Sequence, residues 1–467
     1  MNFRIFVIFS MMLSITFISS LSTATFFELQ EIQTQGIIDS EFFVIDGKSY
    51  IAIANHKESD SVAINSTIFF WDGTIFKKLQ DIPTFGAYDI QTFKINNDFY
   101  LAIANNYNDN KTYSINSKIY KWNGTNFIEF QSIPTVGAAS FAFFEIEDEK
   151  FIAIANRYSG NSNNIDSIIY KWNGNSFVTF QSIPTKGATD IEHVKINNDV
   201  FLAIANEYDD SSRNIYSKIY KWNGHIFTEH QSIKTYSARD WESFVINDEI
   251  FLAVANFGED SSFTTDSKIY KWNGNIFEEY QSIQTSGAND WDSFYIEGRI
   301  YIAVANYMEK STDYNYNIDS KIYQWDGESF IEYQAIETNG GFDFKFFSIS
   351  NDSYVLVGNY RSASDSFLYK WNKECNYNDK DGDGVIDILD FDSNTPLDSA
   401  VYADGRRAEN LYNEIDTLNN AMSQMYTKEQ VQNKIQAILD CCDTDKNGKI
   451  SLEEIINGLE ILSGMKY

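Results

Sequence analysis

Short apolar runs alternate with polar turns along most of the chain, and the alternation has a fixed period. Apolar runs such as FLAIAN are long enough for a strand that is buried on both faces. Each is followed by a run such as SKIYKW, which ends in tryptophan. Repetition on this scale determines the architecture. The apolar runs end in asparagine at seven places, 50 to 53 residues apart: Asn55, Asn105, Asn156, Asn206, Asn256, Asn306 and Asn359.

Each period contains four strand signals. The first follows a turn of the type GAxD, as at residues 241–246, and the second is the run that ends in IAN. The third is SKIYKW, and the fourth is FxxxQxI, as at residues 177–183. Between the third and fourth stands WNG or WDG, a strong signal for a hairpin turn. Four short strands without a helical period predict an antiparallel blade.

The two ends of the repeat region predict a closed ring. A single blade cannot bury both of its apolar faces, whereas blades arranged in a ring bury them against one another. Residues 26–32, FFELQEI, form a fourth-strand sequence with no blade before it, and the last unit stops at Trp371 without a fourth strand. We therefore predict an all-β, seven-bladed β-propeller over residues 25–373. Its N-terminal strand would complete the last blade and leave no sheet edge open.

The repeat FLAIANxx…SxIYKWNGxxFxxxQxIxTxGAxD resembles the epilepsy-associated repeat, also called EAR or EPTP, over all seven units. The resemblance implies a propeller in a secreted or cell-surface protein that binds other extracellular proteins. Three departures stand out. Residues 236–238 read YSA in place of GA, the seventh unit has VGN and GGFD, and Ser140 replaces a recurring aspartate.

That aspartate recurs where each innermost strand should begin, and two interpretations stay open. The residues could form a ring that binds a cation at the mouth of the central channel. Alternatively, each could cap a turn by accepting nearby backbone N–H groups, which we favour because a repeated position is usually structural. The positions are Asp39, Asp89, Asp190, Asp240, Asp290 and Asp343.

Other repeated positions also have structural explanations. We expect the recurring asparagine to cap a loop and the recurring tryptophan to pack between blades. The loops after the asparagine vary from unit to unit. Variable loops on a rigid scaffold carry binding specificity in many proteins, although solvated connectors would vary in the same way.

The composition changes after Trp371, and residues 374–400 contain an oxygen-rich loop that reads NDKDGDGVIDILD. Its spacing would wrap six ligands around one Ca²⁺ ion, with Gly384 at the sharp turn. No helical pattern precedes it, so the loop resembles a thrombospondin type 3 calcium repeat, or a dockerin-like loop, more than a complete EF-hand. The predicted ligands are Asp379, Asp381, Asp383, the Val385 carbonyl, Asp387 and Asp390.

A second loop, DTDKNGKISLEE, matches the spacing of an EF-hand and is flanked by helical patterns. We therefore predict a small α-helical EF-hand domain over residues 401–467, with Ca²⁺ as its cofactor. An apolar stripe over residues 411–425 leaves self-association through these helices open, although packing on the EF-hand is favoured. The predicted ligands are Asp443, Asp445, Asn447, the Lys449 carbonyl, Ser451 and Glu454.

Residues 1–24 have the pattern of a secretory signal peptide. Arg4 is followed by an apolar run over residues 5–17 and by small residues at 22–24. An uncleaved anchor is the alternative, and we expect no transmembrane segment in the mature chain. The three cysteines lie outside the repeats, and Cys375 could pair with Cys441 or Cys442 in an oxidising compartment.

The formal net charge of -30 excludes nucleic acid as a partner, because phosphates require a basic surface. The four histidines show no metal-binding spacing, and no glycine-rich phosphate loop occurs. We therefore predict a non-enzymatic, calcium-binding recognition or adhesion protein. It would be secreted, periplasmic or held at the cell surface, and its propeller would bind an extracellular protein or glycan. The alternatives are a calcium-responsive switch through the EF-hand and an exported hydrolase or lyase.

Overall fold

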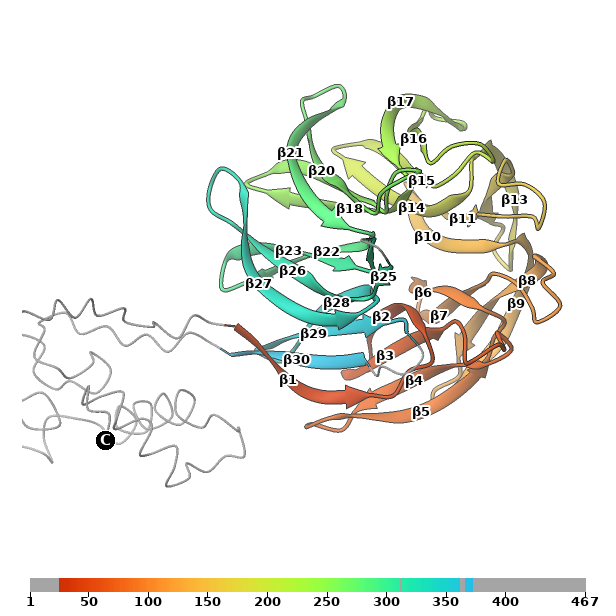
Figure 1. The fold of residues 1–467 in the computed structure, drawn as a ribbon. Helices are drawn as coiled ribbons and strands as arrows, with labels where there is room; N and C mark the ends of the chain where they lie inside the picture. The colour runs from red at the N-terminus through yellow and green to blue at the C-terminus, as the bar shows by residue number, and fades with distance from the viewer. Residues whose placement is uncertain (1–24, 311–312, 362–365, 373–467) are drawn as a thin grey trace, which may run out of the picture. The chain divides into compact units, whose positions relative to one another are not determined.

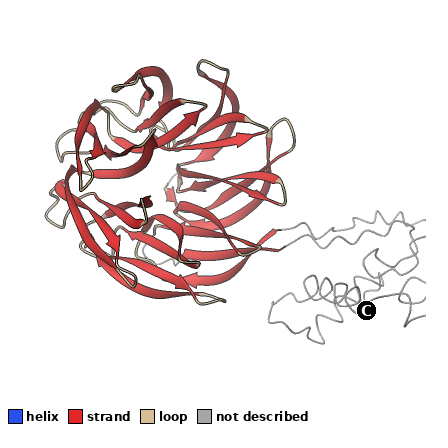
Figure 2. Cartoon of the chain, turned by 180° about the vertical axis from the view of Figure 1, so that it is seen from behind, coloured by secondary structure: helices blue, strands red, loops and turns tan. Residues whose placement is uncertain are grey.

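The computed structural model describes residues 25–310, 313–361 and 366–372, and Phe26–Trp371 forms one unit. In Figure 1 its strands lie as blades around a central axis. Seven antiparallel four-stranded sheets make the blades, and a two-stranded hairpin, β24 (Glu309–Lys310) and β25 (Tyr314–Asn315), extends one loop. Figure 2 shows strands and loops without a helix among the described residues. The predicted seven-bladed β-propeller is confirmed.

The four strands of each blade follow one another outward from the axis. The innermost strands are β2 (Ile37–Ile45), β6 (Ala87–Ile95), β10 (Ala138–Ile146), β14 (Ala188–Ile196), β18 (Ala238–Ile246), β22 (Ala288–Ile296) and β28 (Gly341–Ile349). The second strands are β3 (Lys48–Asn55), β7 (Asp98–Asn105), β11 (Glu149–Asn156), β15 (Asp199–Asn206), β19 (Glu249–Asn256), β23 (Arg299–Asn306) and β29 (Asp352–Asn359). The third strands are β4 (Asn65–Trp71), β8 (Ser114–Trp122), β12 (Asp166–Trp172), β16 (Asn214–Trp222), β20 (Thr264–Trp272), β26 (Asn317–Trp325) and β30 (Ser366–Asn372). The outermost strands are β5 (Phe76–Pro83), β9 (Phe127–Val136), β13 (Phe177–Pro184), β17 (Phe227–Tyr236), β21 (Phe277–Ser286), β27 (Phe330–Asn339) and β1 (Thr25–Ile32).

The second strands are the most deeply buried because both of their faces meet a neighbouring blade. In β3, Ala52 and Ile53 have no exposed surface. The hydrophobic clusters accordingly join two blades: Phe43 of the first packs in one cluster with Leu101 of the second. The tryptophan that ends each third strand reaches back to the previous blade, as Trp122 does to Tyr50, with ring centroids 5.7 Å apart. This confirms that the repeated tryptophans pack between blades.

The recurring asparagine ties loops together, as predicted. The side-chain oxygen of Asn55 accepts the Gln35 N–H at 2.9 Å, and its amide donates to the Asn65 carbonyl at 2.9 Å. The same pair of hydrogen bonds recurs at Asn105 and Asn156. One side chain therefore joins the end of the second strand to the turns before the first and third strands.

The ring closes as the sequence predicts, because β1 pairs with β30 in the sheet β1-β30-β29-β28 (Figure 1). A glutamine of the outermost strand fastens each blade to the next. Gln334 donates to the Phe26 carbonyl and accepts the Phe26 N–H, both at 2.9 Å. The equivalent pairs are Gln30 with Phe76, Gln80 with Phe127, Gln131 with Phe177, Gln181 with Phe227, Gln231 with Phe277 and Gln281 with Phe330.

The turn before each innermost strand requires a left-handed backbone. Gly137 has φ of 56°, and a Cβ atom there would lie 2.3 Å from the Tyr158 carbonyl oxygen. In the fifth blade the corresponding residue is Ser237, at φ of 55°, and its buried hydroxyl has no hydrogen-bond partner. The departure YSA therefore keeps the turn conformation while adding steric strain and an unsatisfied polar atom.

Replacing Ser237 with glycine should raise the free energy of unfolding by about 1 to 2 kcal/mol, because it removes both costs. Urea unfolding followed by tryptophan fluorescence measures this in the full chain, since all nine tryptophans lie between residues 71 and 371. Gly287→Ser makes the reverse change one blade further on, where the new Cβ would meet the Met308 carbonyl oxygen at 2.9 Å, and it should destabilise the protein. A S237G variant that is no more stable than the wild type would contradict this account.

Candidate binding site

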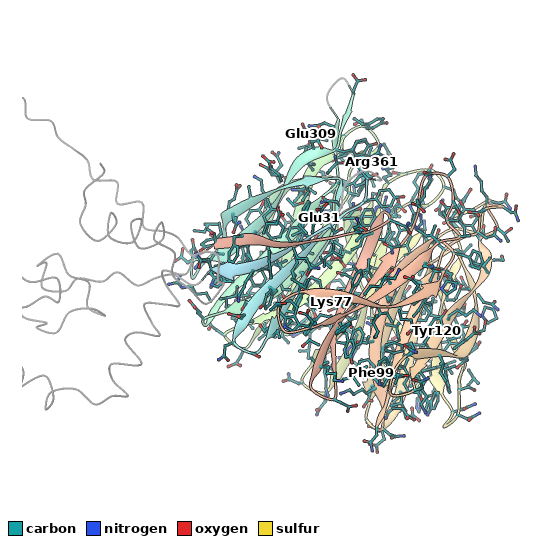
Figure 3. All side chains as sticks on the ribbon, turned by 90° about the horizontal axis from the view of Figure 1, so that it is seen from below. Glu31, Lys77, Phe99, Tyr120, Glu309 and Arg361 are labelled. Carbon is teal, nitrogen blue, oxygen red and sulfur yellow. The ribbon has the colours of Figure 1, made fainter. Side chains whose placement is uncertain are left out.

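One face of the propeller is formed by the loops that follow the second strands, and we call it the loop face. Each loop begins beside the start of an innermost strand. Arg157 donates its backbone N–H to the Gly137 carbonyl at 2.9 Å, and Glu207 donates to Gly187 at 3.0 Å. In the side view of Figure 3, Glu309 and Arg361 lie toward this face, and Phe99 lies toward the opposite one. The seven loops therefore meet around the axis.

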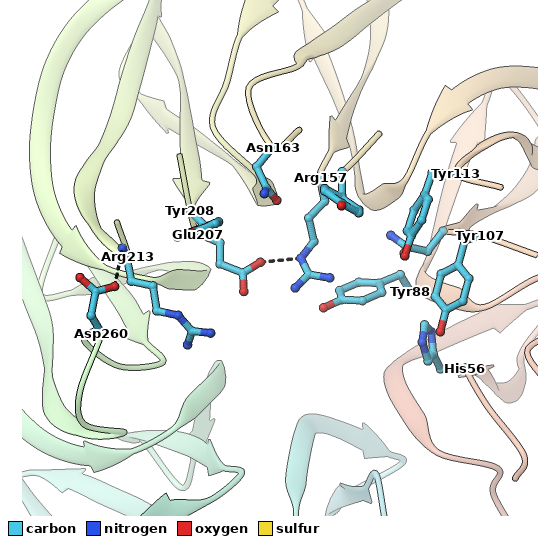
Figure 4. A pocket seen from close by; sticks show the side chains of 12 residues that line it. His56, Tyr88, Tyr107, Tyr113, Arg157, Asn163, Glu207, Tyr208, Arg213 and Asp260 are labelled. Atoms are coloured by element: carbon cyan, nitrogen blue, oxygen red, sulfur yellow. Dashed lines mark hydrogen bonds and ion pairs between the residues drawn. The ribbon is translucent and has the colours of Figure 1, made fainter. Parts of the chain in front are cut away.

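The loop face holds a cavity of about 660 Å³, which we call the loop-face pocket (Figure 4). Its size falls within the range typical of small-ligand sites. The lining comes from loops of neighbouring blades and from Tyr88 of β6, and it is mostly polar. The lining residues are His56, Tyr88, Asn106, Tyr107, Tyr113, Arg157, Tyr158, Asn163, Glu207, Tyr208, Arg213 and Asp260.

A buried ion network stands on one side of this pocket. Glu207 Oε2 lies 2.5 Å from Arg157 Nε, and its Oε1 lies 2.7 Å from Arg239 Nη2. Burial alone would raise the pKa of Glu207, but the charges of Arg157 and Arg239 outweigh it and lower the pKa to about 2. Glu207 therefore stays ionised and fixes both guanidinium groups, which come from different blades.

Aromatic rings form the rest of the wall. Tyr107 packs on Tyr113 with ring centroids 5.2 Å apart, and Tyr113 meets Tyr158 edge-on at 4.9 Å. Tyr88 lies under the Arg157 guanidinium, whose carbon is 5.5 Å from the ring centroid. The Tyr88 hydroxyl also accepts a hydrogen bond from Arg239 at 3.3 Å. These contacts hold the rings in place. The Tyr158 hydroxyl donates to the Gly160 carbonyl at 2.8 Å, so it can still accept a hydrogen bond, and the Tyr88 hydroxyl can still donate one.

Neighbouring loops are braced against each other by aspartates. Asp210 accepts the Asn163 N–H at 2.7 Å and the Ser162 hydroxyl at 2.5 Å across the gap between two blades. Its pKa falls to about 2, chiefly because of the Ser162 hydrogen bond. Asp109 accepts the Val62 N–H at 2.7 Å in the same way. The loops therefore present a fixed surface although their sequences differ.

Acidic side chains surround the axis in two rings beneath the loop face. In the first ring, five of the six carboxylates accept the N–H of the residue one place further along the next innermost strand, and Asp343 accepts the Ser40 hydroxyl there instead. Asp39 accepts from Ile90 at 2.7 Å, and Asp240 accepts from Trp291 at 3.0 Å. Ser140, which replaces the aspartate in one blade, donates to Asp190 at 3.0 Å. The aspartates are therefore braces between blades, whereas the sequence favoured caps of local turns.

The second ring lies two residues further along each innermost strand and consists of Glu41, Gln91, Ala142, Glu192, Glu242, Asp292 and Lys345. Burial raises the pKa of Asp39 and Glu192 to about 7, and that of Asp190 and Asp292 to about 6. Burial and then neighbouring charges raise the pKa well above the ordinary range for Asp89, Asp240, Glu242, Asp290 and Asp343. The folded ring therefore favours protonated carboxyl groups.

Lys345 is the single cationic side chain at the fourteen positions of these two rings. Its Nζ lies 3.1 Å from Glu41 Oε2, and its side chain is 32% exposed. Burial would lower its pKa, but Glu41, Asp292 and other nearby carboxylates outweigh burial and raise the pKa well above the ordinary value. A tethered ammonium therefore offsets part of the negative charge around the axis.

The alternative interpretation of the aspartates as a cation site gains no support from their geometry. Within residues 25–310, 313–361 and 366–372, no group of three or more His, Cys, Asp or Glu side chains is arranged to hold a metal ion. All twelve Ca²⁺ ligands predicted from the sequence lie outside the described residues. So do the signal peptide, the three cysteines and the helices of residues 401–467.

Three of the four histidines have contacts that explain their positions. Burial lowers the pKa of His56 to about 4, and its Nδ1 lies 3.3 Å from the Ala87 carbonyl. His193 stacks on Phe144 with ring centroids 5.3 Å apart. His230 Nε2 lies 2.7 Å from the Asn275 carbonyl. Each of these three histidines thus contacts a backbone carbonyl or an aromatic ring.

The pocket residues were not singled out from the sequence, although a signal was present. The residue directly after the repeated asparagine differs in nearly every blade, while the asparagine itself never changes. A position that varies directly beside a constant one is not required by the fold. It indicates a loop residue that is free to contact a ligand. These first loop residues are His56, Asn106, Arg157, Glu207, Phe257, Tyr307 and Tyr360.

The fold is a seven-bladed β-propeller that carries a polar pocket on its loop face. The chain belongs to the EPTP domain family, which matches it at residues 25–72, 75–123, 126–173, 176–223, 226–273, 276–326 and 329–372. Each of these seven segments runs from the outermost strand of one blade to the third strand of the next, so the sequence repeat is offset from the blade by one strand. The resemblance found in the sequence is confirmed.

The chain is also similar to a curated protein of Mus musculus named "Thrombospondin-type laminin G domain and EAR repeat-containing protein". The two are 44% identical over 142 residues, which is 28% of this chain and 21% of the mouse protein. The likeness therefore spans about a fifth of the relative's length. In the described part of this chain, no helix has the length and apolar character needed to cross a membrane.

Proposed function

We propose that the propeller is the recognition module of an exported protein and that its loop-face pocket binds an extracellular protein or glycan. This proposal rests on the contrast between the contacts that join the blades, which are the same in every blade, and the residues that line the pocket, which differ between blades. Gln334 and its six equivalents make the same inter-blade contact, whereas the lining changes from His56 to Arg157 to Glu207 around the ring. Tyrosine and arginine, which dominate the lining, are among the residues most enriched at energetically important contacts.

A capture experiment with the full chain tests the proposal. Immobilised protein is offered an extract of cell-surface and extracellular material, and the retained molecules are identified. The Tyr158→Ser and Tyr208→Ser changes in the pocket should abolish retention. Ile226→Ser alters an exposed apolar side chain in a turn on the opposite face, where Ile226 is 46% exposed, and should leave retention unchanged. Equal retention by all variants would place recognition elsewhere and overturn the proposal.

We further propose that the two C-terminal loops bind Ca²⁺ through the ligands predicted from the sequence. The ion would stiffen this region or join it to a partner, because such sites are built from closely spaced hard oxygen ligands. Equilibrium dialysis with radioactive calcium tests this. Glu454→Gln should abolish binding at the second loop and leave the first intact. Exposure of new apolar surface on adding calcium, seen by dye binding, would instead support the calcium-responsive switch.

A further inference from the structure

Positive charge is concentrated at the loop-face pocket in a chain whose formal net charge is -30. Of the five arginines between residues 25 and 372, three gather here: Arg157, Arg213 and Arg239. Glu207 is the carboxylate that they share. The nearby Asp260 accepts the backbone N–H of Arg213 at 3.1 Å. Three guanidinium groups thus stand beside two carboxylates, Glu207 and Asp260, which leaves one excess positive charge.

Some of these guanidinium groups have donors without acceptors. Arg213 Nη1 and Arg239 Nε are buried and make no hydrogen bond. Arg213 lies between the rings of Phe257 and Phe263, with its guanidinium carbon 5.9 and 5.8 Å from the centroids. Figure 4 shows the Arg157 and Arg213 side chains extending on either side of Glu207. A desolvated cation with an unsatisfied N–H is costly unless a ligand supplies the missing acceptor.

The roles of the three arginines can be separated by position. Arg239, whose side chain is 12% exposed, neutralises Glu207 and does not line the pocket. Arg157 and Arg213 do line it. Because Arg239 balances the charge of Glu207, the positive charges of Arg157 and Arg213 remain available to a ligand. A carboxylate is the group that matches a guanidinium in geometry, since it accepts two parallel hydrogen bonds.

The rest of the lining favours a sugar over an apolar side chain. Protein anchors insert into apolar, fully desolvated pockets, whereas this pocket is lined by tyrosines and by Asn106 and Asn163. Each of these two amides donates one hydrogen bond within the protein, to the Ala138 carbonyl and to Asp210, and keeps further hydrogen-bonding capacity. Hydroxyl and amide groups both donate and accept hydrogen bonds, as the hydroxyl groups of a sugar require. Tyrosine rings add flat apolar area beside these polar groups. The cavity of about 660 Å³ has the size of a site for a small ligand.

We propose that the loop-face pocket binds an acidic sugar of an extracellular glycan, with Arg157 and Arg213 donating hydrogen bonds to its carboxylate. The tyrosine hydroxyls and the two asparagine amides bind the sugar hydroxyls. This inference rests on the proposed recognition function and names the class of its ligand.

Titration of the full chain with defined sugars, followed by saturation-transfer NMR or calorimetry, tests the inference. The probes are sialyllactose and glucuronic acid, with uncharged lactose and glucose as matched neutral sugars. We expect an acidic sugar to bind, the neutral sugars to bind at least about tenfold more weakly, and added salt to weaken binding. Equal binding of neutral and acidic sugars, or no binding of either acidic sugar, would overturn the inference.

Variants separate the role of Arg213 from effects on folding. Arg213→Gln should weaken acidic-sugar binding about tenfold, because a charge-assisted hydrogen bond is lost. Arg213→Lys keeps the charge but not the planar fork, so it should weaken binding less. Arg299→Gln, which changes an arginine outside the pocket at the start of β23, should bind like the wild type. Thermal unfolding confirms that each variant is folded.

A glutamate-rich peptide serves as the competing ligand. Binding of the peptide through Arg213, without binding of an acidic sugar, would overturn the sugar assignment while leaving the recognition function intact. The sugar assignment also fails, and the recognition function stands, if both acidic sugars fail to bind while retention in the capture experiment still depends on Tyr158 and Tyr208. Loss of both results would refute the proposed function itself.

Discussion

Replacing Lys345 with methionine should lower the free energy of unfolding by roughly 3 kcal/mol at pH 7.5, because it leaves the carboxylates around the axis without their internal cation. Methionine has a similar length and keeps the apolar contacts of the lysine stem, so the change isolates the charge. The ammonium lies 3.1 Å from Glu41 and is surrounded by acidic side chains from several blades. Urea unfolding followed by tryptophan fluorescence gives the measurement.

The matched control for Lys345 is Lys221→Met. Lys221 Nζ lies 2.8 Å from Asp199 in an exposed ion pair, whose side chains are 34% and 50% exposed. Exposed pairs contribute about 1 kcal/mol or less. The K345M variant should also recover much of its stability at pH 5, where more of the ring carboxyl groups are protonated. Similar losses for K345M and K221M would show that the axial lysine has no special role.

The thermal stability of the propeller should rise as the pH is lowered from 7.5 to about 5.5. The carboxyl groups around the axis have a raised pKa in the folded state, to about 7 for Asp39 and Glu192. In this window the folded chain binds more protons than the unfolded chain, so the free energy of unfolding falls as the pH rises. His56 and His193, with a pKa of about 4, act in the opposite direction below about pH 6.5. The nine carboxyl groups with a raised pKa have a larger combined effect on stability than these two histidines.

Substitution of Asp240 shows which property of the ring matters. Asp240→Asn keeps an oxygen that can accept the Trp291 N–H but cannot ionise. It removes the cost of protonating or burying a carboxylate on folding, so it should stabilise the protein by roughly 1 kcal/mol at pH 7.5. It should also reduce the dependence of stability on pH. Asp240→Ala removes the acceptor as well and should be about 1 to 3 kcal/mol less stable than the asparagine variant.

The same variants test the alternative interpretation of the aspartates. If the ring held a cation, calcium would raise the melting temperature of the wild type, and D240N would abolish that increase. The brace interpretation predicts no such response from the propeller. Because the C-terminal loops are also predicted to bind calcium, the comparison is made in a background that carries the Glu454→Gln and Asp379→Asn changes.

Most of the fold could be predicted from the sequence because seven repeat units adopt the same blade structure. The repeated Asn55 position, the Trp122 position and the unpaired strand at residues 26–32 each predicted a contact that the structure contains. A feature that recurs in all seven units does not depend on the peculiarities of one unit. The local pattern of apolar residues and turns was therefore enough to predict the blade. The offset between the sequence unit and the blade was visible for the same reason.

The site was harder to predict because it depends on differences between blades. The Arg157–Glu207–Arg239 network joins residues that are 50 and 32 positions apart, at two different places in the repeat. A pattern shared by all blades cannot indicate such a contact, which exists only once the ring brings three blades together. The role of Lys345 was missed for the same reason, since its main partners, Glu41 and Asp292, come from the two neighbouring blades. The aspartate braces were mistaken for local caps because their partners lie about 50 residues away.

The pair of hydrogen bonds between Gln334 and Phe26 also indicates the order in which the parts of the ring form. The other six glutamine–phenylalanine pairs connect residues 46 to 49 positions apart, whereas this pair connects residues 308 positions apart. Six of the blades can form and fasten in succession as the chain emerges, but β1 must wait until β30 has been made. Closing so long a loop costs more conformational entropy than closing the shorter ones and slows folding. The seam between β1 and β30 is therefore where the ring should close last as it folds and open first when it is strained.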